Sequence, residues 1–321
     1  MHFGQLGDVV LGLPALRAIK GHFSTSKITL LVGKSAAAIA KLAEAADEYI
    51  VVDRVALRDG NKVGSIREIF ALVRDVRSRK FDLVIDLNSL YETNILGFLS
   101  GAKARLYENR ENRSLDRLSR FDTRPPAEDK LKHHTDRYLA VLEPLGIQGT
   151  PRTTLVRPEP QAEKAADSFI ASHELQEKRL IGLFLGAGHP TRRWPVENFV
   201  DLAGELSRKE NTAVLVFLGP EESDMRPGLG EKFGSSAIVV DEMPLTGFYA
   251  MLSRLDVFVA GDTGPMHLAS LAGPDIVLLS EIGSAKVYRP LIKGLVVLED
   301  RPLLEITVDQ VVSAVEKLLK S

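Results

Sequence analysis

The segment best suited to chemistry is Gly-Asp-Thr-Gly-Pro-Met-His at residues 261–267, which follows a short apolar run. The first backbone N–H groups of a helix have no intrahelical acceptor, and together with the helix dipole they favour an anion. Thr263 adds a hydroxyl donor, Gly264 allows a phosphate to come close, and His267 lies in the first turn. A helix start capped by Asp262 is the simpler alternative. We expect an anion site here.

A second loop, which precedes a predicted helix, carries two arginines. Arg192 and Arg193 stand just before Pro195, a residue favoured at the first position of a helix. Guanidinium groups can hold a diphosphate through bidentate hydrogen bonds, although plain surface charge is an equal alternative. We expect Arg192 to lie near the 261–267 segment. Trp194 is the only tryptophan, and we expect it to pack the loop against a sheet.

The first strand-to-helix turn of the chain combines glycines with a carboxylate. Gly4 and Gly7 allow the backbone to approach a ligand, and Asp8 stands at or near a helix start. Such a carboxylate could act as a general base, with a simple helix cap as the alternative. Gln5 and Gly7 are candidates for contact with the group that loses a proton.

Two other polar segments give weaker signals. Residues 101–126 are rich in arginine but also in acidic residues, so a mixed solvated surface is the default expectation. Arg120 is our candidate there for binding an anionic acceptor. The pair His133 and His134 with Asp136 could suggest a metal, but no further ligand cluster accompanies it. We predict no metal site.

The elements that position these segments alternate between strand and helix. Near-continuous apolar runs are typical of parallel strands covered on both faces. We predict strands at 27–32, 49–53, 81–87, 179–185, 212–218, 238–241, 257–260 and 275–279. Helical spacing predicts helices at 35–46, 66–79, 136–145, 195–209, 245–254, 265–272 and 308–320. This alternation predicts an α/β fold with doubly wound parallel sheets.

The chain should divide into two Rossmann-like domains, residues 1–157 and 158–321, with the proline-rich segment 148–161 as the linker. Two such domains leave one natural site, a central cleft at the carboxyl ends of their strands. Only three residues precede Gly4. Either the first strand is very short, or the natural start lies upstream and an added strand would raise the melting temperature.

Composition excludes several classes of protein. The 321 residues carry a net charge of -2, which argues against a general nucleic-acid binder. The absence of cysteine excludes disulfide scaffolds and thiolate metal sites. No apolar run approaches the ~18 residues of a membrane span, and we see no signal peptide. We expect a cytoplasmic protein that can work at a membrane surface.

With the three segments in this order, the chain resembles the ADP-heptose:lipopolysaccharide heptosyltransferases of glycosyltransferase family 9. The resemblance spans nearly the whole chain. The matching residues are 7–11 with 14–18, 192–195 with Glu197 and Phe199, and 261–269. Arg192 stands where the family usually has lysine.

The resemblance implies a GT-B fold, in which two Rossmann-like domains face a cleft and the last helix crosses back to the first domain. It implies inverting, metal-independent transfer of a heptose from ADP-heptose to a lipopolysaccharide core acceptor, with Asp8 as the general base. An acidic residue after Leu218, Glu221 or Glu222, would contact the nucleotide, and Glu222 is our candidate. The expected donor-site residues are Arg192, Arg193, Glu222, Asp262, Thr263, Gly264, Pro265 and His267.

The resemblance also defines the expected partners: a nucleotide sugar, a lipid-linked saccharide and transiently the membrane surface, but no cofactor and no nucleic acid. Two alternatives remain open. The first is a GT-B glycosyltransferase or epimerase that uses another nucleotide sugar. The second is a catalytically weak protein that binds a sugar nucleotide, which would show binding without turnover.

Overall fold

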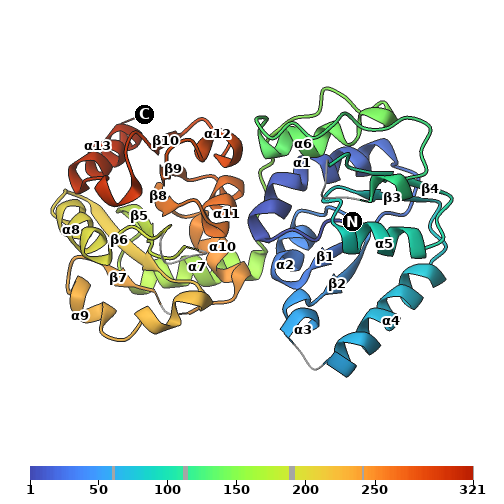
Figure 1. Cartoon of the computed structure of the whole chain (residues 1–321). Coiled ribbons are helices and arrows are strands. Elements are labelled where there is room, and N and C mark those ends of the chain that lie inside the picture. Colours follow the sequence, from blue (N-terminus) through green and yellow to red (C-terminus); the bar gives the residue numbers. More distant parts are fainter. Residues whose placement is uncertain (60–61, 111–114, 188–191, 241, 321) are drawn as a thin grey trace. The chain divides into compact units, whose positions relative to one another are not determined.

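A computed structural model describes residues 1–59, 62–110, 115–187, 192–240 and 242–320 (Figure 1). The chain forms two compact units, Met1–Thr154 and Leu155–Ser321, here called unit 1 and unit 2. We predicted the domain boundary between residues 157 and 158. The two units meet between Thr154 and Leu155, in the same proline-rich segment, 148–161.

Unit 1 contains two pairs of parallel strands. β1 pairs with β2, and β3 pairs with β4. The strands are β1 (Thr29–Gly33), β2 (Glu48–Val52), β3 (Leu83–Asp86) and β4 (Ala104–Tyr107). The first three of these match predicted strands, whereas β4 falls in the arginine-rich stretch 101–126, for which we predicted no strand.

The first residues of the chain bridge these two pairs. The His2 N–H donates to the Leu31 carbonyl at 2.9 Å, next to β1, while the Leu87 N–H donates to the Met1 carbonyl at 3.2 Å, next to β3. The Met1 amine also donates to the Ile85 carbonyl at 2.5 Å. The segment therefore lies between β1 and β3, where His2 makes an isolated parallel bridge to Val32.

Helices of unit 1 follow the strands. They are α1 (Leu6–His22), α2 (Lys34–Leu42), α3 (Arg54–Asp59), α4 (Lys62–Ser78), α5 (Tyr91–Leu99) and α6 (His134–Ala140), with short 3-10 turns at Asp116–Leu118 and Glu143–Leu145. α1 packs against α2 and α6, and α4 packs against α5. α1 begins at Leu6, shortly after the bridge from His2 to Val32, so the hydrogen bonds of the first residues position the turn that carries Asp8.

Unit 2 has one six-stranded parallel sheet in the order β10-β9-β8-β5-β6-β7. Its strands are β5 (Arg179–Phe184), β6 (Thr212–Phe217), β7 (Ile238–Val239), β8 (Val257–Gly261), β9 (Asp275–Leu279) and β10 (Leu295–Leu298). This is the strand order of dinucleotide-binding folds, in which ligands bind where the order reverses. The reversal lies between β5 and β8, and the parallel α/β architecture is confirmed.

Helices cover both faces of this sheet. They are α7 (Pro160–Ser172), α8 (Val196–Ser207), α9 (Leu229–Phe233), α10 (Leu245–Leu252), α11 (Gly264–Ala272), α12 (Ala285–Tyr288) and α13 (Val308–Leu319), with 3-10 turns at Pro220–Met225 and Leu303–Glu305. α8 and α13 pack on one face. On the other face, Phe248 of α10 contacts the rings of Phe184, Phe217 and Phe258.

The last helix, α13, packs on the sheet of its own unit. In α13, Val311 and Val315 are fully buried in the core of unit 2 together with Ala314 and Leu318. These residues repeat at helical spacing, so α13 carries an apolar stripe that the sheet of its own unit covers. Burial of this stripe within unit 2 does not test the expected crossing to the first domain, which stays a prediction.

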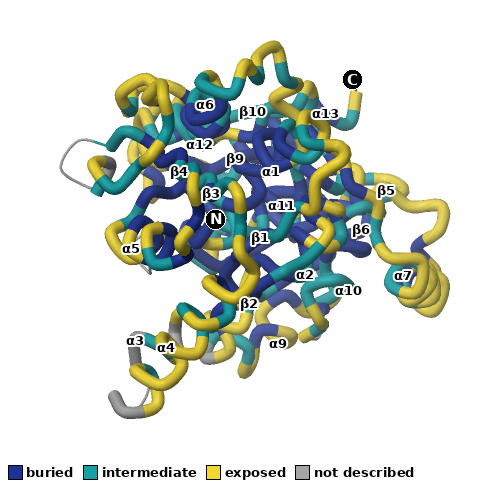
Figure 2. The backbone as a smooth tube through the Cα atoms, turned by 90° about the vertical axis from the view of Figure 1, so that its right-hand side faces the viewer, coloured by how far each residue is buried: buried dark blue, intermediate teal, exposed yellow. Residues whose placement is uncertain are grey.

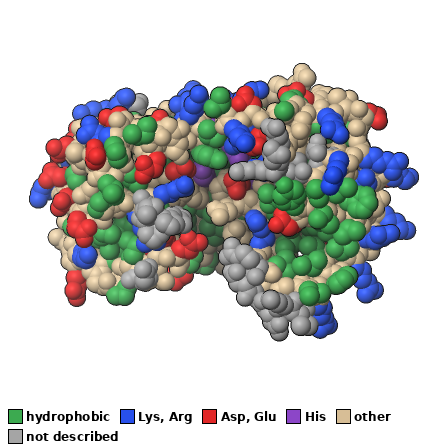
Figure 3. All heavy atoms as spheres, in the orientation of Figure 1, with side chains coloured by type: hydrophobic (Ala, Val, Ile, Leu, Met, Phe, Trp, Pro, Cys, Tyr) green, Lys and Arg blue, Asp and Glu red, His purple; other side chains and the backbone are tan. Residues whose placement is uncertain are grey.

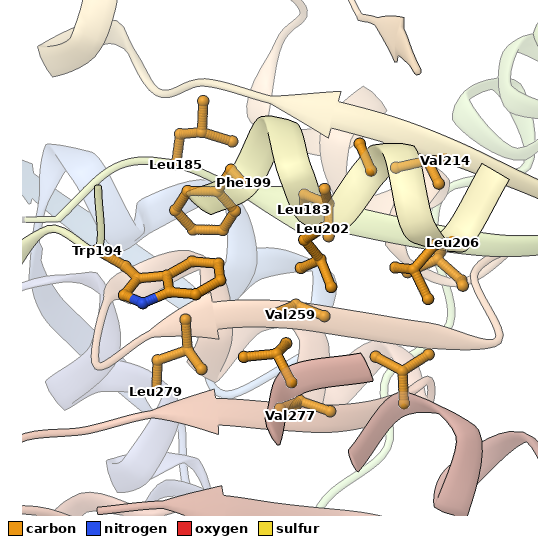
Figure 4. Packing of buried hydrophobic residues seen from close by; sticks show 14 of the residues in the cluster. Leu183, Leu185, Trp194, Phe199, Leu202, Leu206, Val214, Val259, Val277 and Leu279 are labelled. Atoms are coloured by element: carbon orange, nitrogen blue, oxygen red, sulfur yellow. The ribbon is translucent and has the colours of Figure 1, made fainter. Parts of the chain in front are cut away.

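Trp194 has the packing role that we predicted. Its side chain is 3% exposed, its indole N–H donates to the Ile306 carbonyl at 2.9 Å, and its ring meets Phe199 edge-on at 4.8 Å. Figure 4 shows Trp194 next to Phe199 and Leu279 at one end of the core. The indole therefore anchors the loop that carries the two arginines.

We predict that Leu202→Ala lowers the free energy of unfolding by about 2–5 kcal/mol, because it removes a fully buried side chain from this core and leaves a cavity. Denaturant unfolding, monitored on the purified protein, measures the change. The control is Leu304→Ala, at a side chain that is 64% exposed, and it should change stability little. Equal effects of the two substitutions would contradict the assigned core.

Candidate functional site

The two loops at the strand-order reversal of unit 2 lie against each other. A Cβ atom placed on Gly261, at the end of β8, would lie 3.8 Å from the backbone carbonyl oxygen of Arg192. The Arg192 side chain is exposed, and its charge acts on Asp262. The backbone of Arg192 therefore lies beside the start of the 261–267 segment within unit 2. Residues 188–191 of the Arg192 loop, which include Gly188, lie outside the described residues.

The start of α11 leaves its amides uncapped by side chains. Thr263 occupies the N-cap position, makes no side-chain cap, and donates its hydroxyl to the Gly261 carbonyl at 3.4 Å. Asp262, which we considered as a cap, instead accepts a hydrogen bond from the Ser284 hydroxyl at 3.1 Å. Gly264 and Pro265 form the first, partly exposed residues of the helix. This arrangement presents backbone N–H groups to an anion.

Asp262 and His267 form a pair beside these amides. His267 Nε2 lies 3.7 Å from Asp262 Oδ1, and His267 is 5% exposed. Burial acts to raise the pKa of Asp262, but the contacts with His267 and Ser284 and the charge of Arg192 outweigh it, so the net pKa is lowered. Within the described part of the chain, His267 Nδ1 is buried without a hydrogen-bond partner. A ligand group could supply that partner.

Glu222, rather than Glu221, is the buried acidic residue after β6. It is 3% exposed, whereas Glu221 is exposed. Its carboxylate accepts from the Gly219 N–H at 3.1 Å and lies 3.3 Å from Arg193 Nη2. A Cβ on Gly186 would come within 2.4 Å of the carboxyl carbon, so the loop after β5 needs glycine there.

The Glu222–Arg193 pair joins the loops that follow β5 and β6. Burial raises the pKa of Glu222, and the charge of Arg193 partly offsets this. The other terminal nitrogen of Arg193 contacts Met225 Sδ at 3.4 Å. Arg193 therefore contacts protein groups at both ends of its guanidinium, and Arg192 is the arginine exposed beside the α11 start.

In unit 1, Asp8 is the third residue of α1 and not its cap. Gln5 is the N-cap residue, and its N–H donates to Asp8 Oδ2 at 2.9 Å. Gly4 is required by this geometry, because a Cβ there would lie 2.3 Å from Asp8 Cβ. Gln5 is exposed, while Gly7 and Asp8 are partly exposed in the first turn. The carboxylate is thus held by the backbone with one face open.

A buried polar cluster, which the sequence analysis missed, lies beside Asp8. His2 Nδ1 accepts from the Gly4 N–H at 3.4 Å, and the His2 ring meets Tyr138 edge-on at 4.8 Å. Gly12 leaves room for this ring, since a Cβ there would lie 2.6 Å from His2 Nε2. Burial lowers the pKa of His2 to about 3, and burial together with the charge of Asp8 raises that of Tyr138.

The cluster continues through α6 and the segment after β4. His134 Nε2 and the Tyr138 hydroxyl are 2.8 Å apart, and Arg137 contacts both His134 and, at 2.8 Å, Glu128. Burial lowers the pKa of His134 to about 3 and raises that of Glu108 to about 8. No motif links these residues, which are scattered over the first 140 positions, so spacing could not have found them.

The remaining sequence candidates are separate from this cluster or only border it. Arg120 exchanges two backbone hydrogen bonds with Arg105 of β4, at 2.9 and 3.0 Å, and its side chain is exposed. His133 accepts from the Thr135 N–H at 3.3 Å, and Asp136 pairs with Arg152 at 2.6 Å. Arg113 and Glu111 of the arginine-rich stretch lie outside the described residues.

Comparison with known proteins identifies the family. The model for glycosyltransferase family 9 (heptosyltransferase) matches residues 69–280, more than half of the chain. The chain belongs to glycosyltransferase family 9. It is therefore a glycosyltransferase, as the sequence motifs predicted. The matched range includes the Arg192 loop, Glu222 and the start of α11.

Individual relatives agree with this assignment. The lipopolysaccharide core heptosyltransferase OpsX of Haemophilus influenzae is 19% identical over 283 residues, which cover 86% of this chain and 76% of OpsX. A family 9 glycosyltransferase from Veillonella parvula has a TM-score of 0.86 at 26% identity, with 100% and 96% of the chains covered. Escherichia coli heptosyltransferase WaaC with ADP has a TM-score of 0.77 at 20% identity, covering 98% of each chain.

The GT-B class of this family 9 chain follows from these structural matches. Among the described helices, none is long and apolar enough to cross a membrane.

We predict that, between about pH 6.5 and 8, the stability of the wild type falls with rising pH relative to the stability of Glu108→Gln. The folded-state pKa of Glu108, about 8, is above its ordinary value of 4.5, so in this range the folded state holds a proton that the unfolded state has lost. The stabilisation that the Glu108 carboxyl contributes is complete below pH 4.5. It is lost as the pH rises through the pKa that Glu108 has in the folded protein.

His2 and His134 act in the opposite direction only below their ordinary pKa of 6.5. Burial also lowers the pKa of the Met1 amine from 8.0, which opposes Glu108 between pH 6.5 and 8, so the difference in slope between the wild type and Glu108→Gln isolates Glu108. Urea unfolding at several pH values measures the slope. Glu92→Gln, at an exposed carboxylate of α5, is the control and should leave the slope unchanged. A wild-type slope retained in Glu108→Gln would show that another group causes it.

Proposed function

We propose that this family 9 enzyme transfers a heptose from ADP-heptose to a lipopolysaccharide core acceptor, with inversion and without a metal. The observation that carries the proposal is the site at the strand-order reversal of unit 2, where Arg192 lies beside the uncapped start of α11 and buried His267. The names of the relatives, OpsX as a lipopolysaccharide core heptosyltransferase and WaaC with ADP, support the choice of donor and acceptor.

The donor diphosphate would bind at this site of unit 2. As the bond between the anomeric carbon and the phosphate oxygen breaks, negative charge grows on the leaving diphosphate. Arg192, the first-turn amides of α11 and the Thr263 hydroxyl would stabilise that charge, with His267 Nδ1 as a further partner. Pro265 has no N–H, so Gly264 and Met266 supply the amides. Glu222 would support the nucleotide by holding the two neighbouring loops.

The acceptor would bind in unit 1. Its hydroxyl oxygen forms the new bond to the anomeric carbon on the face opposite the diphosphate, and its proton passes to the Asp8 carboxylate. The hydrogen bond from the Gln5 N–H orients that carboxylate. Gln5, Gly7 and Arg120 are the proposed acceptor-side groups. Because the acceptor is lipid-linked, we place the reaction in the cytoplasm, at the inner face of the inner membrane.

We predict that Asp8→Asn lowers kcat by about 10²–10⁴-fold, the usual contribution of a positioned base, while ADP binding is nearly unchanged. The amide keeps the size of the side chain but cannot take the proton. Transfer assays with ADP-heptose and isolated core acceptor measure kcat. Asp82→Asn, at an exposed acid of the same unit, is the control. Full turnover in Asp8→Asn would rule out Asp8 as the base.

We predict that ADP raises the melting temperature more than UDP, GDP or CMP at equal concentration. A ligand at 100 times its Kd stabilises the folded protein by about 2.7 kcal/mol, which a thermal-shift assay detects readily. Arg192→Ala should reduce the ADP effect, whereas Arg226→Ala in the same unit serves as a control. Preference for UDP or GDP would overturn the heptose donor and leave the fold assignment intact.

A further inference from the structure

Large hydrophobic side chains are exposed together on two neighbouring helices of unit 1. Of the eleven such side chains exposed in the part of the chain that the structure describes, six lie on α4 and α5. We call these six residues the apolar patch: Ile66, Ile69 and Phe70 on α4, and Tyr91, Ile95 and Phe98 on α5. Single exposed hydrophobic residues are ordinary, but a cluster marks an interaction surface.

The patch follows helical geometry on both helices. In α5, Tyr91, Ile95 and Phe98 have the spacing i, i+4, i+7, which places them on one face. In α4, Ile66 and Phe70 are one turn apart, and Phe70 is 72% exposed. These positions therefore form continuous apolar stripes.

The core of unit 1 does not need these side chains. The second half of α4 supplies the residues that pack on the sheet, Leu72, Val73 and the 3% exposed Val76. Figure 2 shows the first half of α4 extending with α3 beyond the sheet, with most of its residues exposed. An apolar stripe that the fold leaves in water requires another explanation.

Basic residues border the apolar patch. Arg67, Arg74 and Arg77 are exposed on α4. Arg74 lies one helical turn beyond Phe70, and Arg77 lies two turns beyond it. Residues 64–80 hold five arginines or lysines and two acidic residues, although the whole chain has a net charge of -2. The guanidinium of Arg105, in β4, lies 5.4 Å from the centre of the ring of Phe98, in α5. Figure 3 shows hydrophobic side chains beside Lys and Arg in this region.

We propose that the apolar patch and its basic border dock unit 1 on an anionic phospholipid bilayer. Aromatic and aliphatic side chains enter the boundary between headgroups and acyl chains, while arginines beside them contact lipid phosphates. The local positive charge on a chain of negative net charge is complementary to an anionic surface. The inference deepens the proposed function, since a lipid-linked acceptor would be met at that surface, and it places acceptor capture on unit 1.

Vesicle flotation with the full chain tests the proposal. Vesicles of phosphatidylcholine alone are compared with vesicles in which phosphatidylglycerol replaces part of the phosphatidylcholine. We expect binding to the anionic vesicles that weakens with added salt. Arg74→Glu with Arg77→Glu should lower the binding by at least about tenfold, because each basic residue near such a surface contributes about fivefold. Phe70→Ser should lower it severalfold at every salt concentration.

Matched controls lie in the same unit. Leu131 is 73% exposed, so Leu131→Ser removes an equally exposed hydrophobic side chain outside the patch. Lys130→Glu with Lys132→Glu reverses two exposed charges there. Both controls should bind anionic vesicles like the wild type. Circular dichroism and melting temperature verify that each variant is folded, which we expect because all these side chains are exposed.

The outcomes separate this inference from the proposed function. Transfer to a delipidated, soluble core saccharide should be unchanged in Phe70→Ser, whereas transfer to acceptor in vesicles should fall. Wild-type transfer activity without vesicle binding would overturn the docking inference alone, and vesicle binding without transfer would overturn the proposed function alone. A wild-type dimer that Phe70→Ser dissociates, with no vesicle binding, would show that a second copy covers the patch.

Discussion

Parallel strand pairing is the constraint on which both candidate sites depend. Because all strands of a parallel sheet run in one direction, their carboxyl ends lie along one edge, and the loops that follow them are neighbours. In unit 2 this brings together the loops after β5, β6 and β8, which carry Arg192, Glu222 and Asp262. In unit 1 the first residues bridge β1 and β3 and lead into the turn that carries Asp8.

The two units prepare their sites by different physical means. Unit 2 presents backbone amides at the start of α11 and balances the charge of Asp262 with His267 and Arg192. Such a site needs little charge of its own, because the helix terminus supplies partial positive charge. Unit 1 instead surrounds Asp8 with buried polar side chains, among them His2 and Tyr138. Those groups are neutral or paired, as burial requires.

Buried pairs also explain why some glycines stand where they do. Gly186 gives room to the Glu222 carboxylate, and Gly4 gives room to Asp8. A methyl group on Gly4 would collide with Asp8, the proposed base. A methyl group on Gly186 would collide with Glu222, which supports the donor site. The glycines therefore serve close packing at the sites rather than loop freedom alone.

Local patterns in the sequence determined most of the strands and the anion-binding helix start. Apolar runs predict strands because burial on both faces leaves little room for polar residues, and 261–267 is recognisable because an amide-rich helix start is a local structure. β10 carries the apolar run Leu-Val-Val-Leu, a signal that we overlooked. β4 contains Arg105, whose guanidinium donates to the Ala102 and Leu118 carbonyls, so its polarity concealed a strand.

Only the tertiary structure decided which of two adjacent residues takes a role and which distant residues meet. Arg193 rather than Arg192 pairs with Glu222, and Glu222 rather than Glu221 is buried, because the loops after β5 and β6 pack together. His2 meets Tyr138 across more than a hundred positions. α13 packs on the sheet of its own unit, which covers its apolar stripe. Side-chain spacing along a chain predicts local geometry, whereas these choices depend on burial between segments that no local pattern relates.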